Sequence, residues 1–138
     1  MSDVVYTAHV STEGGRAHGH AVADDGNLDV RLAYPTALGG DGKGTNPEQL
    51  FAAGYASCFT GALNLVAKNE GVKIGPHTVD ADVDLIKDAP SFKIGVTLTL
   101  KAAELDKAEA ERLLKLAHEV CPYSKAIRGN VDVKLAVG

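Results

Sequence analysis

The sequence predicts an α+β fold in which antiparallel strands at both ends of the chain are covered by two helices. Two observations support this prediction. A long uncharged run over 49–67 follows a helix-capping sequence, and an amphipathic run follows a second capping sequence that begins at Asp106. Short stretches of alternating apolar and polar residues, separated by turn sequences, flank the long run as strands would.

The chain of 138 residues is predicted to form a single domain over 1–138, because it is long enough for one core and too short for two. With 45% hydrophobic and 23% charged residues, it has the composition of a globular protein. A net charge of −4 and the lack of a Lys/Arg cluster argue against binding to nucleic acid or to an anionic membrane. Because Met1 to Thr7 does not resemble a secretory signal, we expect a cytoplasmic protein.

The first third of the chain is predicted to form a small sheet. Turn sequences at 13–15 and 24–27 separate three stretches of strand-like residues, and the second turn is a good hairpin signal. The predicted strands cover 4–10, 16–22 and 28–32. A glycine-rich loop follows over 34–44, where backbone conformations that other residues disfavour are expected.

A long helix is predicted from Pro47 to Asn69. Asn46 can cap it, Gln49 completes a pattern like a capping box, and Gly71 ends it. Its uncharged run approaches the length that a bilayer requires. Because small and polar residues make the run only mildly apolar, and no Trp or paired basic residues flank it, we expect a helix wrapped in a soluble core.

The second half is predicted to contain three strands and a second long helix. Asp106 and Glu109 form a capping box that opens the amphipathic helix, and Pro122 ends it directly after Cys121. A short helical turn is expected to follow as far as Gly129. The predicted strands cover 77–86, 92–101 and 130–137.

Two separated cysteines, Cys58 and Cys121, are the first candidates for chemistry. Neither belongs to a C-x-x-C pair, and a cytosolic protein has little need of a structural disulfide, so a functional redox pair is considered. Cys58 lies in mid-helix, where burial alone would raise its pKa and leave it an inert packing residue. A reactive Cys58 therefore requires a cation, which lowers a thiol pKa by about 1–3 units.

Arg16 and Glu48 are the candidates for activating Cys58. Arg16 follows two glycines, where the backbone can turn tightly and direct the side chain inward. Glu48 lies in the first turn of the predicted helix and could hold the guanidinium through a bidentate pair. From the spacing alone, a solvated arginine and a surface carboxylate are the more ordinary interpretation.

Cys121 has a different setting, at a helix end before a proline. Its sulfur can move without disrupting a core element, as a resolving thiol must when the Cα atoms come within about 7 Å. A helix-end cysteine without a function is the alternative. His118 and Cys121 are three residues apart, but two ligands do not form a zinc site, and the other histidines show no ligand spacing. No metal site is therefore predicted.

Two motifs resemble those of the organic hydroperoxide resistance proteins, the Ohr branch of the OsmC/Ohr family. One runs from Leu38 to Phe59 and includes Cys58, and the other is His118-Glu-Val-Cys-Pro-Tyr-Ser124. The sequence Gly14-Gly-Arg16, the hairpin and Leu32-Ala-Tyr-Pro35 also fit, so the resemblance covers essentially the whole chain.

The resemblance implies a thiol peroxidase that reduces organic or fatty-acid hydroperoxides to alcohols. It implies antiparallel sheets wrapped around a long central helix, in an intertwined homodimer with the active site at the subunit interface. Cys58 would be the peroxidatic cysteine and Cys121 the resolving one, and the two would form a disulfide. Arg16 and Glu48 would activate the thiolate and orient the peroxide. No bound cofactor is implied, because an external dithiol, dihydrolipoamide on a lipoylated protein, would recycle the enzyme.

A hydrophobic shell around Cys58 is predicted to favour organic hydroperoxides over hydrogen peroxide, since each buried CH₂ contributes about 0.8 kcal/mol. Its candidates are Leu38, Phe51, Tyr55 and Phe59. Core packing is the alternative role for each of them. The chain departs from many relatives at positions whose effect on the thiolate pKa or on loop mobility is open: Ala17, His18, His20 and Ser57.

Two other functions stay open. An OsmC-type peroxidase would use the same cysteines with a different substrate preference, although Cys121-Pro-Tyr-Ser124 favours the Ohr branch. A non-catalytic carrier of a hydrophobic ligand would merely bury its cysteines. In the carrier Cys58 would alkylate slowly below neutral pH, whereas in a peroxidase it would alkylate rapidly there.

Overall fold

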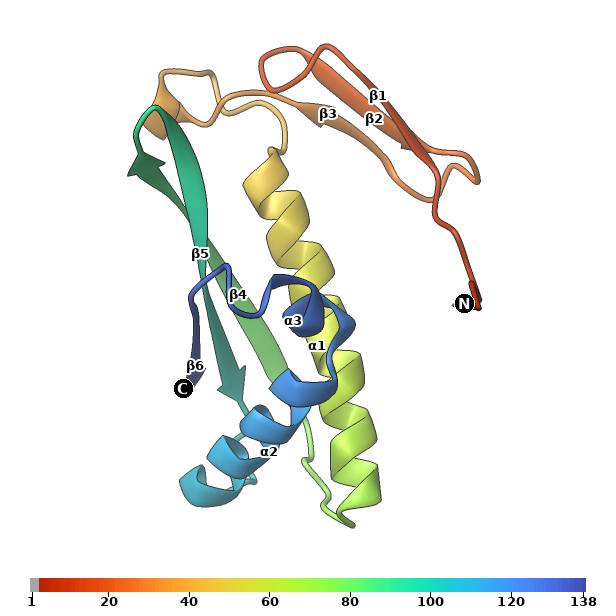
Figure 1. Ribbon diagram of the computed structural model, residues 1–138, viewed down its shortest axis with the longest axis vertical. Coiled ribbons are helices and arrows are strands. Elements are labelled where there is room, and N and C mark those ends of the chain that lie inside the picture. The colour runs from red at the N-terminus through yellow and green to blue at the C-terminus, as the bar shows by residue number, and fades with distance from the viewer. Residues whose placement is uncertain (1–2) are drawn as a thin grey trace. The chain divides into compact units, whose positions relative to one another are not determined.

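The computed structural model describes residues 3–138, which form two small sheets, one long helix and three short helical segments (Figure 1). By their contacts the residues divide into two compact units, with the boundary between Leu50 and Phe51, inside the long helix. The α+β class predicted from the sequence is confirmed. The prediction of a single domain stays a prediction.

The first unit contains an antiparallel sheet with the strand order β1-β2-β3. Its strands are β1 (Val10–Glu13), β2 (Gly19–Ala23) and β3 (Asp29–Leu32), followed by the 3₁₀ helix η1 (Thr36–Leu38). Ala21 is the only hydrophobic side chain of residues 3–50 that is buried. This sheet therefore has almost no core of its own.

The predicted boundaries of the first two strands are wrong. The strand predicted over 4–10 begins only at Val10, because its partner β2 ends at Ala23, where the chain turns away. The strand predicted from Arg16 begins at Gly19. Gly14 and Gly15 both have positive φ, at 79° and 64°, so the chain turns there and interrupts the strand. Arg16 consequently lies in the loop between β1 and β2.

The helix α1 (Pro47–Asn69) has the predicted bounds. The Asn46 side chain accepts a hydrogen bond from the Gln49 backbone N–H at 2.8 Å, as an N-cap does. Gly71 follows the helix with φ of 68°. By length and composition α1 could cross a membrane, a test that core helices of globular proteins also pass, and its buried side chains belong to the core of the second unit.

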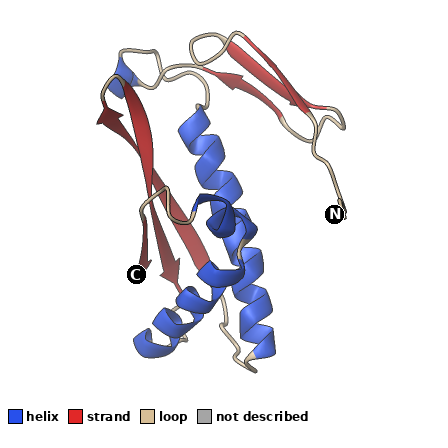
Figure 2. Ribbon diagram, in the orientation of Figure 1, coloured by secondary structure: helices blue, strands red, loops and turns tan. Residues whose placement is uncertain are grey.

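The second unit contains a sheet with the strand order β4-β5-β6 beside α1 (Figure 2). β4 (Thr78–Asp88) and β5 (Ser91–Lys101) form a long antiparallel pair, as predicted. β6 (Val133–Val137) is shorter than predicted and pairs in parallel with β5. The sheet is mixed because a helical connection returns the chain to the same end of the sheet before β6 begins.

That connection consists of α2 (Lys107–Val120) and α3 (Pro122–Ile127). The Asp106 carboxylate caps α2 by accepting a hydrogen bond from the Glu109 N–H, as the capping sequence predicts. Leu98, Leu113 and Leu63 are fully buried and belong to one core formed by β5, α2 and α1. This core fixes the helices that carry the two cysteines.

Candidate active site

The two thiols lie side by side in the second unit. Cys58 is partly buried on α1, and Cys121 is fully buried at the end of α2. Their sulfur atoms are 3.9 Å apart and both thiols are free. A disulfide requires about 2.05 Å, so the sulfurs need to approach by less than about 2 Å. The structure thus brings together two cysteines that are far apart in the sequence.

Cys121 occupies the joint between two helices. Its backbone N–H donates to Ala117 O at 2.8 Å, which ends α2, and its carbonyl accepts from Lys125 N at 2.9 Å, which begins α3. Pro122 follows at the first position of α3, where a missing N–H costs no helical hydrogen bond. The Cys-Pro sequence therefore places a buried sulfur between two helix ends.

The environment of Cys58 in the second unit favours the neutral thiol. Burial raises the pKa of Cys58, and a backbone hydrogen bond from Tyr123 to the sulfur lowers it less strongly. The neighbouring Cys121 raises the pKa further through its charge and its hydrogen bond. A cation near Cys58 would counter these effects and favour the thiolate, as predicted from the sequence.

Arg16 and Glu48 form an ion pair in the first unit. Nη1 of Arg16 donates to Oε2 of Glu48 at 3.0 Å and lies 2.9 Å from Oε1. One nitrogen thus faces both oxygens, in place of the two-nitrogen fork that a bidentate pair would use. The Arg16 side chain is 40% exposed and makes no other hydrogen bond within residues 3–138. Most of its donors are therefore available to another group.

The sequence predicts that Arg16 contacts Cys58. These two residues belong to different units of the structure. The pair with Glu48 lies in the first unit and the pair of thiols in the second. Each pair is formed within its own unit. The approach of the guanidinium to the sulfur stays a prediction.

Comparison with known proteins gives the chain its family. The family model for OsmC-like protein matches residues 40–136. The chain is 53% identical to the organic hydroperoxide resistance protein OhrB of Bacillus subtilis, with 95% of this chain and 96% of that protein covered. The chain belongs to the OsmC-like family, among the organic hydroperoxide resistance proteins.

Two further relatives agree with this assignment. The organic hydroperoxide resistance protein of Xanthomonas axonopodis pv. citri is 48% identical over 97% of this chain and 95% of its own length. The crystal structure of an organic hydroperoxide resistance protein from Legionella pneumophila matches with a TM-score of 0.91 and 47% identity, covering 99% of each chain. The resemblance of the chain to the organic hydroperoxide resistance proteins is thereby confirmed.

The four residues predicted to form a hydrophobic shell around Cys58 differ in how deeply they are buried. Tyr55 and Phe59 are fully buried in the core of the second unit, which is the alternative role considered for them. Phe51 is partly buried and packs edge-on against Tyr55, with ring centroids 6.1 Å apart. Leu38 lies in η1 of the first unit and is 51% exposed. A substrate-binding role stays a prediction for all four.

The sequence pattern singles out Tyr55 and His118 but does not predict that Ser124 joins them by hydrogen bonds. The Ser124 hydroxyl lies 2.6 Å from the Tyr55 hydroxyl and 2.8 Å from Nδ1 of His118. The Tyr123 ring stacks on Tyr55 at 5.6 Å. His118 and Ser124 are each three residues from Cys121, and Tyr55 is three residues before Cys58, a spacing that places side chains on a shared helix face. That spacing is the signal that could have found them.

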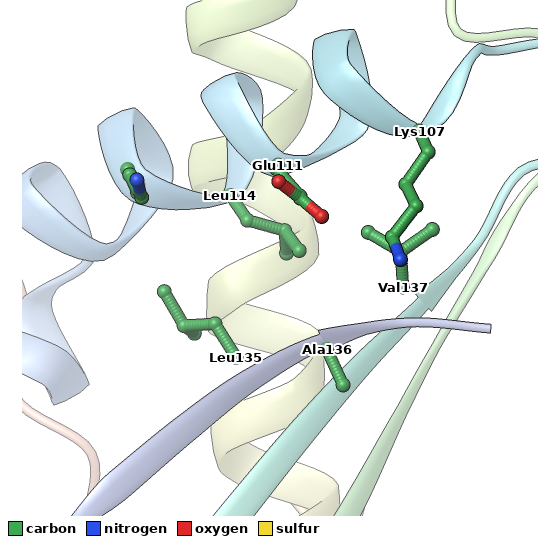
Figure 3. Close-up of a pocket in the computed structure, with 7 residues that line it drawn as sticks. Lys107, Glu111, Leu114, Leu135, Ala136 and Val137 are labelled. Atoms are coloured by element: carbon green, nitrogen blue, oxygen red, sulfur yellow. The ribbon is translucent and has the colours of Figure 1, made fainter.

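A groove of about 450 Å³ lies elsewhere in the second unit, between α2 and β6 (Figure 3). The side chains that line it include Lys107, Glu111, Leu114 and Leu135. None of its lining residues belongs to the predicted site. Within residues 3–138 no group of three or more His, Cys, Asp or Glu side chains is placed to hold a metal ion.

Proposed function

We propose that the protein is a thiol-dependent peroxidase that reduces organic hydroperoxides to alcohols. The observation that carries this proposal is the 3.9 Å separation between the partly buried sulfur of Cys58 and the fully buried sulfur of Cys121. One thiol can meet a substrate while the other is held back from it. The names of the relatives, organic hydroperoxide resistance proteins, support hydroperoxide as the substrate.

The proposed cycle has three steps. The Cys58 thiolate attacks the outer oxygen of ROOH, and the O–O bond breaks to give a sulfenic acid and an alcohol. Cys121 then attacks the sulfur of the sulfenic acid, which forms the disulfide and releases water. An external dithiol reduces the disulfide by exchange, so the protein needs no resident cofactor.

Arg16 is proposed to activate Cys58, from the same chain or from a second copy. A guanidinium beside the sulfur would counter the burial that raises the pKa of Cys58. It would also stabilise negative charge as it develops on the peroxide oxygens. Glu48 would hold the arginine through the ion pair already described, which leaves other guanidinium donors for the peroxide.

Organic or fatty-acid hydroperoxides are the proposed substrates, and a dihydrolipoamide group on a lipoylated protein is the proposed reductant, in the cytoplasm. The partly buried Phe51 and the exposed Leu38 offer apolar surface for an alkyl chain. An OsmC-type preference is the alternative within the family. Steady-state rates with cumene hydroperoxide against hydrogen peroxide, and with dihydrolipoamide against thioredoxin as reductant, separate these choices.

A homodimer is also proposed, because two surfaces lack cover. In the first unit, residues 3–50 bury only Ala21 among their hydrophobic side chains, and a three-stranded sheet needs a packed face to be stable. In the second unit, α1 exposes an uncharged stripe formed by Ala53, Ser57, Gly61 and Leu65. Both surfaces fit burial against a second copy of the chain.

Replacement of each cysteine tests the catalytic proposal. Cys58→Ser should abolish hydroperoxide consumption. Cys121→Ser should allow one turnover and then stall, with Cys58 trapped as sulfenic acid or overoxidised. A Cys58→Ser protein that consumes cumene hydroperoxide at the native rate would exclude this function.

A non-catalytic carrier of a hydrophobic ligand is the second candidate, because burial raises the pKa of Cys58 within its own unit. A carrier has no need of a thiolate. Iodoacetamide labelling of Cys58 as a function of pH distinguishes the two functions. Rapid labelling below neutral pH supports the peroxidase, and labelling that begins only well above the ordinary thiol pKa supports the carrier.

A further inference from the structure

Three hydrogen-bonded side chains join the helices that carry the two cysteines. Ser124 is at the centre of this chain, 2.6 Å from the Tyr55 hydroxyl and 2.8 Å from Nδ1 of His118. Tyr55 and Ser124 are both fully inaccessible to solvent, and Ser124 is the one buried polar side chain of residues 3–138 that is not aromatic. A buried hydroxyl is costly unless it is hydrogen-bonded, so this chain is a specified part of the core.

Each member of the chain lies one helical turn from a cysteine. Tyr55 precedes Cys58 by three residues on α1, and His118 precedes Cys121 by three residues on α2. Ser124 follows Cys121 by three residues on α3. The bond between His118 and Ser124 therefore spans the joint at Cys121, and the bond between Ser124 and Tyr55 ties that joint to the helix of Cys58.

The chain has a complete set of partners when His118 is neutral. Burial lowers the pKa of His118, the charge of Arg128 lowers it further, and Glu119 on the same helix raises it less strongly. Neutral imidazole can accept a hydrogen bond at Nδ1 from the Ser124 hydroxyl, whose oxygen accepts one from the Tyr55 hydroxyl. In the opposite direction the buried Tyr55 hydroxyl would accept from Ser124, and its own hydrogen would have no acceptor within residues 3–138. The direction from Tyr55 through Ser124 to neutral His118 is therefore the one that satisfies both hydroxyl donors.

We propose that His118, acting through Ser124 and Tyr55, is a positioning residue for the resolving step, in which Cys121 attacks Cys58. The inference rests on the proposed peroxidase function and adds the side chains that hold the second thiol in place. Without these side-chain bonds, the joint between α2 and α3 would keep its backbone hydrogen bonds but lose its polar attachment to α1, so the sulfur of Cys121 would be held less closely in line with Cys58. Reaction geometry of this kind is sensitive to displacements of about 1 Å.

The resolving step, in which Cys121 attacks Cys58, balances in atoms and electrons. Cys121 loses its thiol proton, and its sulfur forms a bond to the Cys58 sulfur as the S–O bond of the sulfenic acid breaks. The departing hydroxyl takes up a proton and leaves as water. The sulfur of Cys121 is oxidised and that of Cys58 is reduced, so no further oxidant is needed. The sulfurs close from 3.9 Å to about 2.05 Å.

A pair of similarly sized replacements tests the proposal. His118→Leu removes the bond to Ser124, whereas His118→Asn supplies an amide near the position of Nδ1. After one equivalent of cumene hydroperoxide, disulfide formation should be at least about ten-fold slower in His118→Leu and within about three-fold of wild type in His118→Asn. Dimedone should trap more sulfenic acid in the leucine variant, which shows that the first step still occurs.

Two more variants make the test independent of one substitution. Tyr55→Phe keeps the aromatic core and removes only the hydroxyl, and it should slow disulfide formation as His118→Leu does. Thr60→Val is the matched control, because it removes a hydroxyl from the same helix that bonds only to Ala56 O. It should form the disulfide at the native rate. Circular dichroism verifies that each variant is folded.

Distinct results overturn the inference and the function on which it rests. If His118→Leu and Tyr55→Phe form the disulfide within about two-fold of the native rate, or if His118→Asn is as slow as His118→Leu, the positioning role is wrong. If the native protein itself forms neither sulfenic acid nor disulfide with the hydroperoxide, the peroxidase proposal fails instead.

Discussion

The pKa of Cys58 depends on opposing effects from its surroundings, and a nearby cation would determine whether the thiolate forms. Burial and the neighbouring Cys121 raise the pKa of this thiol, and the Tyr123 N–H alone opposes them. A neutral thiol is a weak nucleophile toward peroxide. Arg16 has donors to spare after its pair with Glu48, and a guanidinium stays charged at any physiological pH. The proposed role of Arg16 can therefore be tested by measuring the pKa of Cys58.

Replacement of Arg16 should raise the pKa of Cys58. In Arg16→Leu the alkylation midpoint of Cys58 should move up by about 1–3 units, because the cation that favours the thiolate is gone. The rate with an alkyl hydroperoxide at neutral pH should fall about 10- to 1000-fold. Stopped-flow alkylation and peroxidase assays measure both. Arg31→Leu, at an exposed arginine of β3, is the control. An unchanged midpoint in Arg16→Leu would identify another cation as the activator.

His118 should make the stability of the protein depend on pH. Its folded pKa lies below the ordinary 6.5, first because of burial and then because of Arg128. Between these two values the unfolded chain binds a proton that the folded protein does not. The free energy of unfolding should thus be highest above about pH 6.5 and fall as the pH drops toward the folded pKa.

Urea unfolding at about pH 7.5 and about pH 5.5 measures this effect. His118→Asn keeps a hydrogen-bonding group but cannot be protonated, so it should lose less stability between the two pH values than the native protein. Equal losses in both proteins would contradict the linkage to His118.

Among the secondary-structure elements, helix ends were the most accurately predicted features. The bounds of α1 and the Asp106 cap follow from local hydrogen bonds between a side chain and a nearby N–H, which sequence alone specifies. The start of β1 and the parallel pairing of β6 depend on where a partner strand ends or how the chain returns. Such information is non-local, so the pattern in each strand could not contain it.

In the candidate site, too, local features were predicted from the sequence and non-local contacts were not. Cys58 and Cys121 were found because cysteine chemistry and two motifs single them out. The bond of Ser124 to Tyr55 joins residues 69 positions apart, so it emerges only from the packing of α3 on α1. The pair of Arg16 and Glu48 was suggested by the sequence, but the use of one nitrogen for both oxygens is a detail of side-chain geometry that residue spacing does not specify.

The cap of α2 should contribute measurably to stability. Asp106→Ala removes the acceptor for the Glu109 N–H, which should cost about 1 kcal/mol of unfolding free energy. Asp106→Asn keeps an acceptor oxygen of similar capping strength and should stay within about 0.5 kcal/mol of wild type. Urea denaturation at one protein concentration compares them. Equal destabilisation by both replacements would mean that the charge, rather than the cap, is what matters.

For the whole molecule, two apolar surfaces are exposed in a single chain: the hydrophobic residues of the first unit and the uncharged stripe of α1. The first unit buries one hydrophobic side chain in residues 3–50, and it exposes Val4, Val5 and Tyr6. Isolated sheets of this size gain too little from burial to offset the entropy of ordering. The exposed stripe of α1 contains small residues that allow close approach of another helix. The proposed second copy of the chain would cover both surfaces through one self-complementary interface.

A charge placed in the stripe of α1 should therefore break the dimer. Leu65 is 54% exposed in the single chain, so Leu65→Glu should cost little in a monomer, whereas an unpaired carboxylate buried in an interface costs several kcal/mol. Sedimentation equilibrium should find a dimer for the native protein and a monomer for Leu65→Glu. Lys115→Glu, a charge change at an exposed position of α2, should remain dimeric. If the native protein sediments as a monomer with a folded first unit, the bare surfaces need no partner and the dimer proposal is wrong.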